Sequence, residues 1–368
     1  MMKHSTPSVS VFSKDSYLIM PKQLIAIKDQ VEAVGTPLKE WDISINYGIK
    51  TGFNEAFIIS KEKKDELIAA DPKSAEILKP ILRGKDIKRY KAEFADLWLV
   101  AIFPTLNIHI DNYPAVKKYL ETFLPKLKQT GEFFTNQGGQ REKTRKKTSN
   151  QWFETQDQIS YYRYFKKEKI IYPNMTSLLP FMFDNQGYLT NQKCFILTSN
   201  NYQISLRYLV ALLNSKIFRF LYKNDFPELM GKTYELSKVF FEKISLPLVS
   251  ETEANKYNIL VKCIVFSHKN FTDKVHTFET ILDALIFQLY FPTHMQEKQI
   301  DIAQFVENDL NQVLQNRDFE QLNDSEKEII IKQLHSQWTH PDNEVRNRIK
   351  LFAVRSPDIL KPILESQP

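Results

Sequence analysis

Cysteine is scarce in this chain, and long apolar runs are absent. Its 368 residues hold two cysteines, Cys194 and Cys263, which are far apart in the sequence. That spacing excludes zinc-ribbon and redox motifs and suits a reducing compartment better than a disulfide scaffold. No run of about 18 apolar residues suggests a membrane-spanning helix. Residues 1–20 lack the apolar core of a signal peptide, so we expect a cytoplasmic protein.

Sequence motifs for catalysis are also missing. The seven histidines form no HExxH pattern or other ligand spacing, and no GxSxG occurs. There is no FxGxG-type loop for S-adenosylmethionine and no Asp/Asn/Ser-Pro-Pro-aromatic tetrad. Residues 62–64, EKK, fit half of a nuclease site, but such triplets are common by chance and no strand-borne acid completes this one. We therefore predict no catalytic, metal-binding or cofactor-binding residue in this chain.

Charge is present in ordinary amount, at 26% of residues, but it is unevenly distributed. Residues 251–368 carry 13 Lys/Arg and 18 Asp/Glu, whereas residues 1–250 carry 37 and 26. A basic part joined to an acidic part indicates that the basic part meets a polyanion. The alternative is a distribution that serves solubility alone.

Hydrophobic periodicity predicts an α+β protein with a mixed sheet and inserted helices, followed by a mostly helical C-terminal region. We expect an arm over 1–22, an α+β domain over 23–250 and the helical region over 251–368. This division agrees with a typical domain length of ~150 residues. The helices are expected at 23–34, 61–70, 114–128, 204–223, 254–268 and 277–290. The strands are expected at 42–47, 56–59, 97–103, 169–172 and 194–197.

Residues 48–52, GIKTG, look at first like a phosphate-binding loop. A nucleotide loop needs its Lys and Ser/Thr after the second glycine, at the start of a helix. Here Lys50 and Thr51 precede Gly52, and the next segment has the pattern of a strand. We interpret the glycines as a tight turn that allows close approach to its backbone, with Lys50, Thr51 and Asn54 available to touch a ligand. A purely structural hairpin fits the same pattern.

Two further segments gather positive charge. Residues 79–90 place cations around one glycine, where Arg forks can read guanine and both cation types can hold phosphates. The candidate DNA contacts in this segment are Arg83, Lys85, Asp86 and Arg89. Asp86 would orient an arginine or accept from a cytosine amino group, and a solvated turn is the alternative. Residues 126–169 hold eleven Lys/Arg and five Asp/Glu, a set suited to phosphate contacts. The candidates there are Arg141, Lys143, Arg145, Lys146, Lys147, Arg163, Lys166 and Lys167. The aromatic residues at 161–165 pack in the core or stack on bases.

Seven stretches follow one another in an order known from one family. They are GIKTGFNEAF (48–57), LKPILRGKDI (78–87), KIIYP (169–173), LLNSK (212–216), ISLPL (244–248), ILDALIFQLY (281–290) and PDNEVRN (341–347). From about residue 24 onward the chain resembles the TaqI-like C-terminal specificity domain. That domain occurs in adenine-specific DNA methyltransferases, including type IIG restriction-modification enzymes and BREX-type relatives.

The resemblance implies sequence-specific recognition of double-stranded DNA in a restriction-modification or phage-defence setting. It adds Lys216, in the LLNSK stretch, to the expected DNA contacts. In the family a methyltransferase domain precedes this region, and only a short polar arm precedes it here. We therefore expect S-adenosylmethionine in a methyltransferase partner or in a missing N-terminal domain, and no catalysis by this chain alone. The alternatives are a DNA-modifying enzyme in its own right and a basic protein-interaction or inhibitor module.

Overall fold

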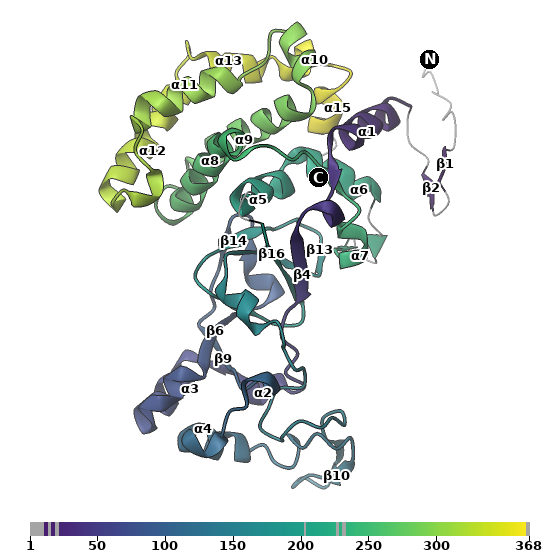
Figure 1. The fold of residues 1–368 in the computed structure, drawn as a ribbon, viewed down its shortest axis with the longest axis vertical. Helices are drawn as coiled ribbons and strands as arrows, with labels where there is room; N and C mark the ends of the chain where they lie inside the picture. Colours follow the sequence, from purple (N-terminus) through teal and green to yellow (C-terminus); the bar gives the residue numbers. More distant parts are fainter. Residues whose placement is uncertain are drawn as a thin grey trace.

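In the computed structural model, the described residues are 11–13, 16–18, 22–201, 204–225, 228–229 and 233–365. The arm predicted over 1–22 therefore lies largely outside the described residues. Figure 1 shows an elongated molecule with helices at one end, a narrow middle that contains β4 and β16, and a smaller lobe at the other end. Among the described residues, no helix has the length and apolarity needed to cross a membrane.

A four-stranded antiparallel sheet occupies the middle of the molecule, in the order β14-β12-β16-β4. Its strands are β4 (Ile43–Tyr47), β12 (Lys169–Pro173), β14 (Met182–Asp184) and β16 (Cys194–Ser199). Successive side chains of a strand point to opposite faces. Ile170 and Tyr172 therefore enter one hydrophobic core, whereas Ile171 enters another. Because both faces are covered, β12 and β16 have the nearly continuous apolar sequences that predicted them as strands.

The core that Ile171 enters, called the lower core, extends into the smaller lobe. It is built on a second sheet, in the order β15-β6-β9-β5. Its strands are β5 (Ile58–Ser60), β6 (Leu78–Leu82), β9 (Leu97–Val100) and β15 (Leu189–Thr190). The helices of this lobe are α2 (Asn54–Phe57), α3 (Lys61–Ala70) and α4 (Pro114–Glu121). The short strand pairs are β1 (Val11–Ser13) with β2 (Ser16–Leu18), β7 (Ile87–Lys88) with β8 (Lys91–Ala92), and β10 (Phe133–Thr135) with β11 (Arg141–Lys143).

The core that Ile170 and Tyr172 enter, called the upper core, lies between the other face of the central sheet and the helices. The helices before residue 250 are α1 (Lys22–Val34), α5 (Leu206–Asn214), α6 (Lys216–Asp225) and α7 (Lys238–Phe241). The long helices after it are α8 (Glu251–Asn270), α9 (Val275–Tyr290), α11 (Ala303–Leu314) and α12 (Asp324–Thr339). The short ones are α10 (Pro292–Glu297), α13 (Glu344–Lys350), α14 (Phe352–Arg355) and α15 (Leu360–Glu365). Small strands complete this part, namely β3 (Thr36–Pro37), β13 (Met175–Thr176), β17 (Glu228–Leu229), β18 (Thr233–Glu235) and β19 (Ser245–Leu246).

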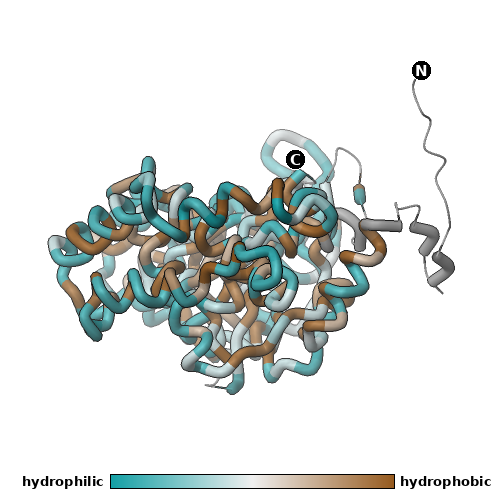
Figure 2. Tube along the Cα trace, turned by 90° about the horizontal axis from the view of Figure 1, so that it is seen from above, coloured by the Kyte–Doolittle hydropathy of each residue, from teal (hydrophilic) through white to brown (hydrophobic). Residues whose placement is uncertain are grey.

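The α+β architecture and the helical C-terminal region agree with the sequence prediction. Figure 2 shows apolar and polar residues alternating along these helices, as expected where one face of a helix is buried. However, Trp41 and Tyr172 share the upper core with Leu260 and Leu285. The change of composition near residue 250 therefore does not coincide with a boundary between cores.

Several predicted bounds differ from the structure by up to three residues, as for the strand expected over 97–103, which ends at Val100, and three other elements differ in number, length or type. The helix expected over 204–223 is two helices, because the Ser215 hydroxyl accepts from the amide of Phe218 and starts a new helix, α6. The helix expected over 114–128 ends at Glu121. The strand expected over 56–59 begins only at Ile58, because one turn of helix, α2, comes first.

Candidate nucleic-acid interface

The GIKTG loop is held between other segments of the chain. The amide of Gly48 donates to the carbonyl of Cys194 at 2.8 Å, and a Cβ placed on Gly48 would lie 2.0 Å from the carbonyl oxygen of Asn191. Gly52 has a φ of +81°, and a Cβ there would lie 2.9 Å from Oε1 of Gln156. Both glycines allow the close approach that the sequence suggested, but the approaching groups are the protein's own.

The three predicted contact residues of this loop differ in exposure. Thr51 is buried, and its hydroxyl donates to Oδ1 of Asn54 at 2.7 Å while accepting from the amide of Phe53. Lys50 and Asn54 are exposed. Thr51 therefore shapes the turn, and only Lys50 and Asn54 have side chains on the surface.

Arg145 has the opposite environment from the surface cations beside it in the sequence. Its buried guanidinium donates to the carbonyls of Leu127 (2.9 Å), Thr51 (3.0 Å), Glu154 (2.7 Å) and Trp152 (2.5 Å). Burial lowers the pKa of Arg145 to about 10, which leaves the group charged at neutral pH. Arg145 thus fixes three loops to one another and is not placed to contact a phosphate of a bound duplex.

A basic hairpin projects from these fixed loops. Strands β10 and β11 pair only with each other, and Phe133 on β10 is 58% exposed. The guanidinium of Arg141 lies 4.2 Å from the centre of the Phe133 ring, and the ammonium of Lys143 lies 5.6 Å from it. On the other face, Lys126 pairs with Glu142 at 2.6 Å and so holds the pKa of that carboxyl below its usual value.

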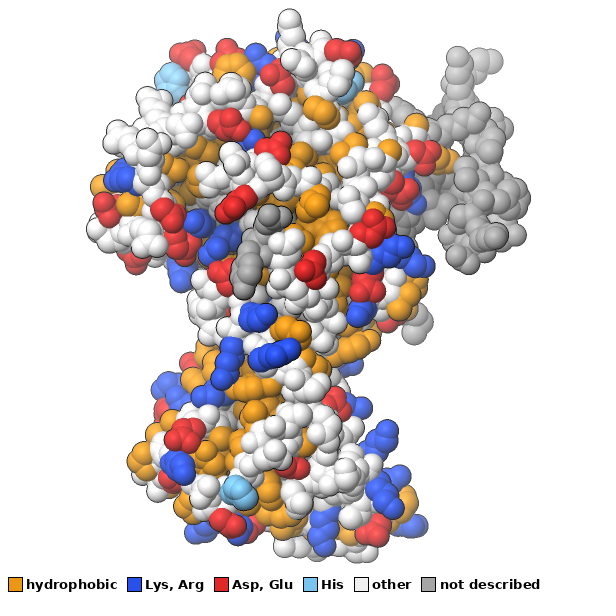
Figure 3. Space-filling view, viewed as in Figure 1, with side chains coloured by type: hydrophobic (Ala, Val, Ile, Leu, Met, Phe, Trp, Pro, Cys, Tyr) orange, Lys and Arg blue, Asp and Glu red, His pale blue; other side chains and the backbone are white. Residues whose placement is uncertain are grey.

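Several exposed cations of the lower half have no carboxylate partner. Within the described ranges, no ion pair involves the following exposed side chains: Lys50, Lys85, Arg141, Lys143, Lys146, Lys147, Arg163, Lys166 and Lys167. Figure 3 shows Lys and Arg gathered over the narrow middle and at the lower right, near the position of β10 in Figure 1. Unpaired surface cations are the groups that can neutralise phosphates without first breaking an internal ion pair.

The cations at 163–167 lie in or directly after a 3₁₀ turn, η6 (Tyr162–Lys166), and over its tyrosines. Arg163 is 5.5 Å and Lys167 5.3 Å from the ring centre of Tyr164. Next to the turn, the hydroxyl of Tyr161 donates to the carbonyl of Tyr47 at 2.9 Å. This bond ties η6 to the strand that leads into the GIKTG loop.

Asp86 orients Arg83, which is one of the two roles expected for it. Nε and Nη2 of Arg83 donate to the two carboxylate oxygens of Asp86 at 2.9 and 2.8 Å. Lys85 is exposed between them in sequence, and the carbonyl of Lys193 lies 3.4 Å from where a Cβ on Gly84 would be. Lys193 is also exposed, and the sequence did not predict it because no other cation is close to it in the chain.

Arg89 and Lys216 lie elsewhere, at the junction of β7 with the helices. Arg89 donates to the carbonyl of Asn214 at 2.8 Å and pairs with Glu279 at 3.6 Å. Lys216 pairs with Asp283 at 3.9 Å, and burial raises the pKa of that carboxyl. These two predicted DNA contacts therefore join the α+β part to α9.

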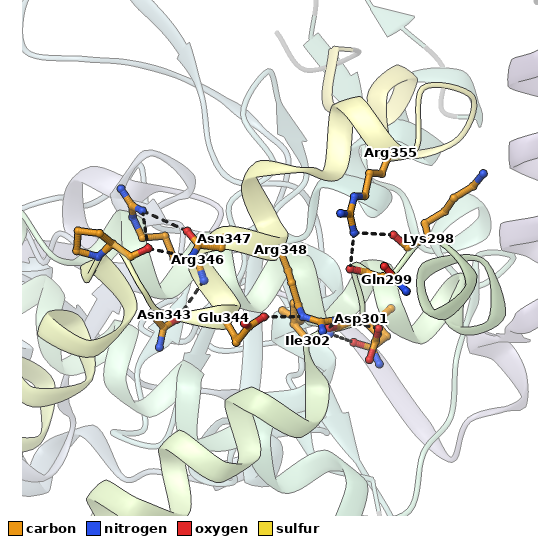
Figure 4. Close-up of polar contacts among 12 residues, drawn as sticks. Lys298, Gln299, Asp301, Ile302, Asn343, Glu344, Arg346, Asn347, Arg348 and Arg355 are labelled. Atoms are coloured by element: carbon orange, nitrogen blue, oxygen red, sulfur yellow. Dashed lines mark hydrogen bonds and ion pairs between the residues drawn. The ribbon is translucent and has the colours of Figure 1, made fainter.

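The LLNSK and PDNEVRN stretches also have internal roles. The side chain of Asn214 donates to the carbonyl of Phe181 at 2.9 Å and accepts from its amide at 3.2 Å. In PDNEVRN, Asn343 caps α13 by accepting from the amide of Arg346, and Asn347 donates to the carbonyl of Pro341. Figure 4 shows the contacts of the PDNEVRN stretch.

The contacts drawn in Figure 4 continue along the last helices. Arg348 donates to the carbonyl and the carboxylate of Asp301 and pairs with Glu344. Arg355 donates to the carbonyls of Lys298 and Gln299, both at 3.1 Å. The cations of this tail thus fasten α13 and α14 to the loop after α10.

A cavity of about 740 Å³ lies between β8, β14 and the helices α8 and α12. Its cations face an almost equal number of carboxylates, and Lys262 and Arg207 both pair with Glu320. It is therefore a weaker candidate for binding a polyanion than the hairpin. Among the described residues, no group of three or more His, Cys, Asp or Glu is arranged to hold a metal ion.

Comparison with known proteins identifies the class of domain. Residues 79–246 match the family model of the TaqI-like C-terminal specificity domain. Residues 79–246 are therefore similar to a TaqI-like specificity domain, as the motifs predicted.

Two solved structures are similar over a larger part of the chain. One is the type IIL restriction-modification enzyme MmeI in complex with DNA, with 12% identity and a TM-score of 0.44, covering 88% of this chain and 36% of that one. The other is the type IIG restriction endonuclease BpuSI, with 12% identity and a TM-score of 0.41, covering 73% and 33%. This chain thus spans about a third of the length of either enzyme. A search of curated proteins found no match.

Proposed function

We propose that this chain recognises specific sequences in double-stranded DNA, as the specificity part of an adenine-specific methyltransferase or restriction-modification system. The observation that carries the proposal is the match of residues 79–246 to a TaqI-like specificity domain. The unpaired cations at the lower end of the molecule support it, because phosphate contacts supply most of the sequence-independent affinity for DNA.

In this mechanism the candidate cations divide into two kinds. Lys50, Lys146 and Lys147 come from mutually bonded loops and hold the sugar-phosphate backbone. Arg83 is restrained by Asp86 in one orientation, which suits a side chain that reads a base edge rather than a phosphate. Positioning and base reading are then carried by different residues.

Chemistry on the adenine belongs to a partner in this proposal. Methyltransferases extrude the target base into a pocket and transfer a methyl group there, which S-adenosylmethionine supplies when bound. A glycine-rich cofactor loop joins a parallel strand to a helix, whereas β6 is followed by a 3₁₀ turn and β15 by the strand β16. In this proposal no step is therefore assigned to the cofactor in this chain.

The test is binding of the full chain to a pool of duplexes with a randomised central segment, followed by salt titration with the selected duplex. We expect a preferred site and a fall in log affinity with log salt of about 0.9 for each phosphate neutralised. No binding at low salt, with or without a methyltransferase subunit, would overturn the proposal. Methyl transfer by the isolated chain would show instead that it is an enzyme in its own right.

A further inference from the structure

The β10–β11 hairpin is a small two-stranded ribbon at one end of the molecule (Figure 1). Phe133 pairs with Lys143, and Thr135 pairs with Arg141. The five residues between the strands, 136–140, are the sequence NQGGQ. Strands of three residues extend ~10 Å and lie ~5 Å apart. The major groove of DNA is about 12 Å wide and about 8.5 Å deep, and it admits a two-stranded ribbon of this size.

The two faces of the ribbon have different environments. Directly paired residues share a face, so Phe133, Thr135, Arg141 and Lys143 form one side, and all four are exposed. On the opposite side, Glu142 is paired with Lys126 and faces the lobe. The exposed side thus offers two cations and an aromatic ring, with neither cation paired to a carboxylate among the described residues.

The tip presents amide side chains that the hairpin itself does not use. Asn136 is engaged in the turn, because its Oδ1 accepts from the amides of Gly138 and Gln140 and its Nδ2 donates to Glu142. Gln137 and Gln140 are exposed, and their side chains form no hydrogen bond within the described part of the chain. A glutamine amide can pair with N6 and N7 of adenine in the major groove.

Hydrogen bonds fasten the base of the hairpin to neighbouring loops, so the ribbon projects from an ordered base. Arg145, which follows β11 closely in the sequence, donates to four backbone carbonyls. Gln129, just before β10, donates to the carbonyls of Gln151 and Glu154 and accepts from the hydroxyl of Thr148. Ordering a recognition element in the free protein lowers the entropy lost on binding.

We propose that the β10–β11 hairpin enters the major groove of the recognised duplex, where Gln137 and Gln140 read base edges with a preference for adenine. Arg141 and Lys143 contact the phosphates that flank the groove, and Phe133 packs against the groove wall. This inference rests on the proposed function and adds to it a specificity-determining element.

The test compares the full chain with the double variant Gln137→Ala/Gln140→Ala in selection from the randomised duplex pool. We expect the variant to lose discrimination of roughly ten- to a hundred-fold at one or two adenine positions, because a good bidentate pair discriminates by about that factor. Affinity for a non-selected duplex should change less than about two-fold, because the phosphate contacts remain. Arg141→Ala/Lys143→Ala should weaken all duplexes alike and reduce the salt slope.

Gln296→Ala, on the exposed surface of α10, is the matched control and should change neither quantity. If the unaltered chain selects a site and the double glutamine variant selects the same site equally well, the hairpin inference is wrong and the proposed function stands. If the unaltered chain binds no duplex, or binds all duplexes alike, the proposed function itself fails.

Discussion

Replacing Arg145 by alanine separates a role inside the protein from a role at the DNA. The substitution removes a buried guanidinium that donates to four backbone carbonyls from three loops. Thr51 and Glu154 retain a second donor to their carbonyls, from Gln156 and Gln129. The carbonyls of Leu127 and Trp152 have no other donor among the described residues, so the variant leaves them unpaired.

An unpaired buried polar group costs about 1–3 kcal/mol, which applies in full to the buried Leu127 carbonyl and in part to the half-buried Trp152 carbonyl. Arg145 also lies over the ring of Phe57, at 5.2 Å, and this packing is lost as well. We therefore expect Arg145→Ala to lower the free energy of opening the 127–157 loops by about 3–5 kcal/mol.

Hydrogen exchange measures this loss where it occurs. The amide of Gln156 donates to the carbonyl of Thr51, so its exchange reports on the opening of the loops that Arg145 joins. A loss of 3–5 kcal/mol would speed its exchange by roughly two to four orders of magnitude, at 1.36 kcal/mol for each factor of ten. Urea unfolding of the same variant should show an early loss of structure in the lower lobe.

The matched control is Arg141→Ala, on the exposed side of the hairpin. It should leave the free energy of unfolding within about 0.5 kcal/mol of the unaltered chain and weaken DNA binding instead. The reasoning is refuted if Arg145→Ala leaves hydrogen exchange unchanged and weakens DNA binding to the same degree as Arg141→Ala, because Arg145 would then act as a surface cation.

Three other predictions test separate parts of the structure. Gly48→Ala should destabilise the chain by more than about 2 kcal/mol, because its Cβ would meet the carbonyl of residue 191. Gly139→Ala has open space around it and should cost only ~1 kcal/mol, for its positive φ. Urea unfolding of the two variants compares these costs. Burial and the nearby charge of Lys91 lower the pKa of His268 to about 4, so the unfolded chain binds this proton more tightly. Stability should therefore fall as pH drops from ~6.5 towards 4, and His268→Gln should flatten that part of the curve of unfolding midpoint against pH. Lys146→Ala should weaken binding to all duplexes equally and reduce the salt slope by about 0.9; a change in sequence preference would contradict its assignment to phosphate.

The elements with strong local signals could be predicted from the sequence. The helix predicted over 61–70 matches α3, which Ser60 caps at its start. The strand predicted over 42–47 differs from β4 by one residue, because its polar and apolar residues alternate. The break at Ser215 could not be found from periodicity, because the same apolar face continues from α5 into α6. The shared upper core could not be found either, because net charge reports surface composition and not which buried residues meet.

The candidate site shows the same division. Asp86 is three residues after Arg83, and their pairing could be inferred from that spacing alone. Arg145 and Lys146 are adjacent in one basic run, yet one is buried and the other exposed. What separates them is the contact of this run with Thr51, which is distant in sequence. The hairpin had only a weak signal, the Gly-Gly pair at 138–139, because its strands FFT and REK do not alternate apolar and polar residues.

The charge asymmetry has a structural consequence because the two parts share a core. The acidic residues of 251–368 cannot move away from the basic lobe as a separate domain would. Their negative potential therefore keeps a fixed position relative to the basic lobe (Figure 3). Under the proposed function, a duplex that approaches the helical end is repelled, and one that approaches the hairpin is attracted. At physiological ionic strength such fields decay within about 8 Å, so the acidic helices act mainly on the rate and direction of approach. The affinity of the bound state is then set by the cations that touch phosphates, and neutralising acidic residues of α12 should change the association rate at low salt more than the dissociation rate.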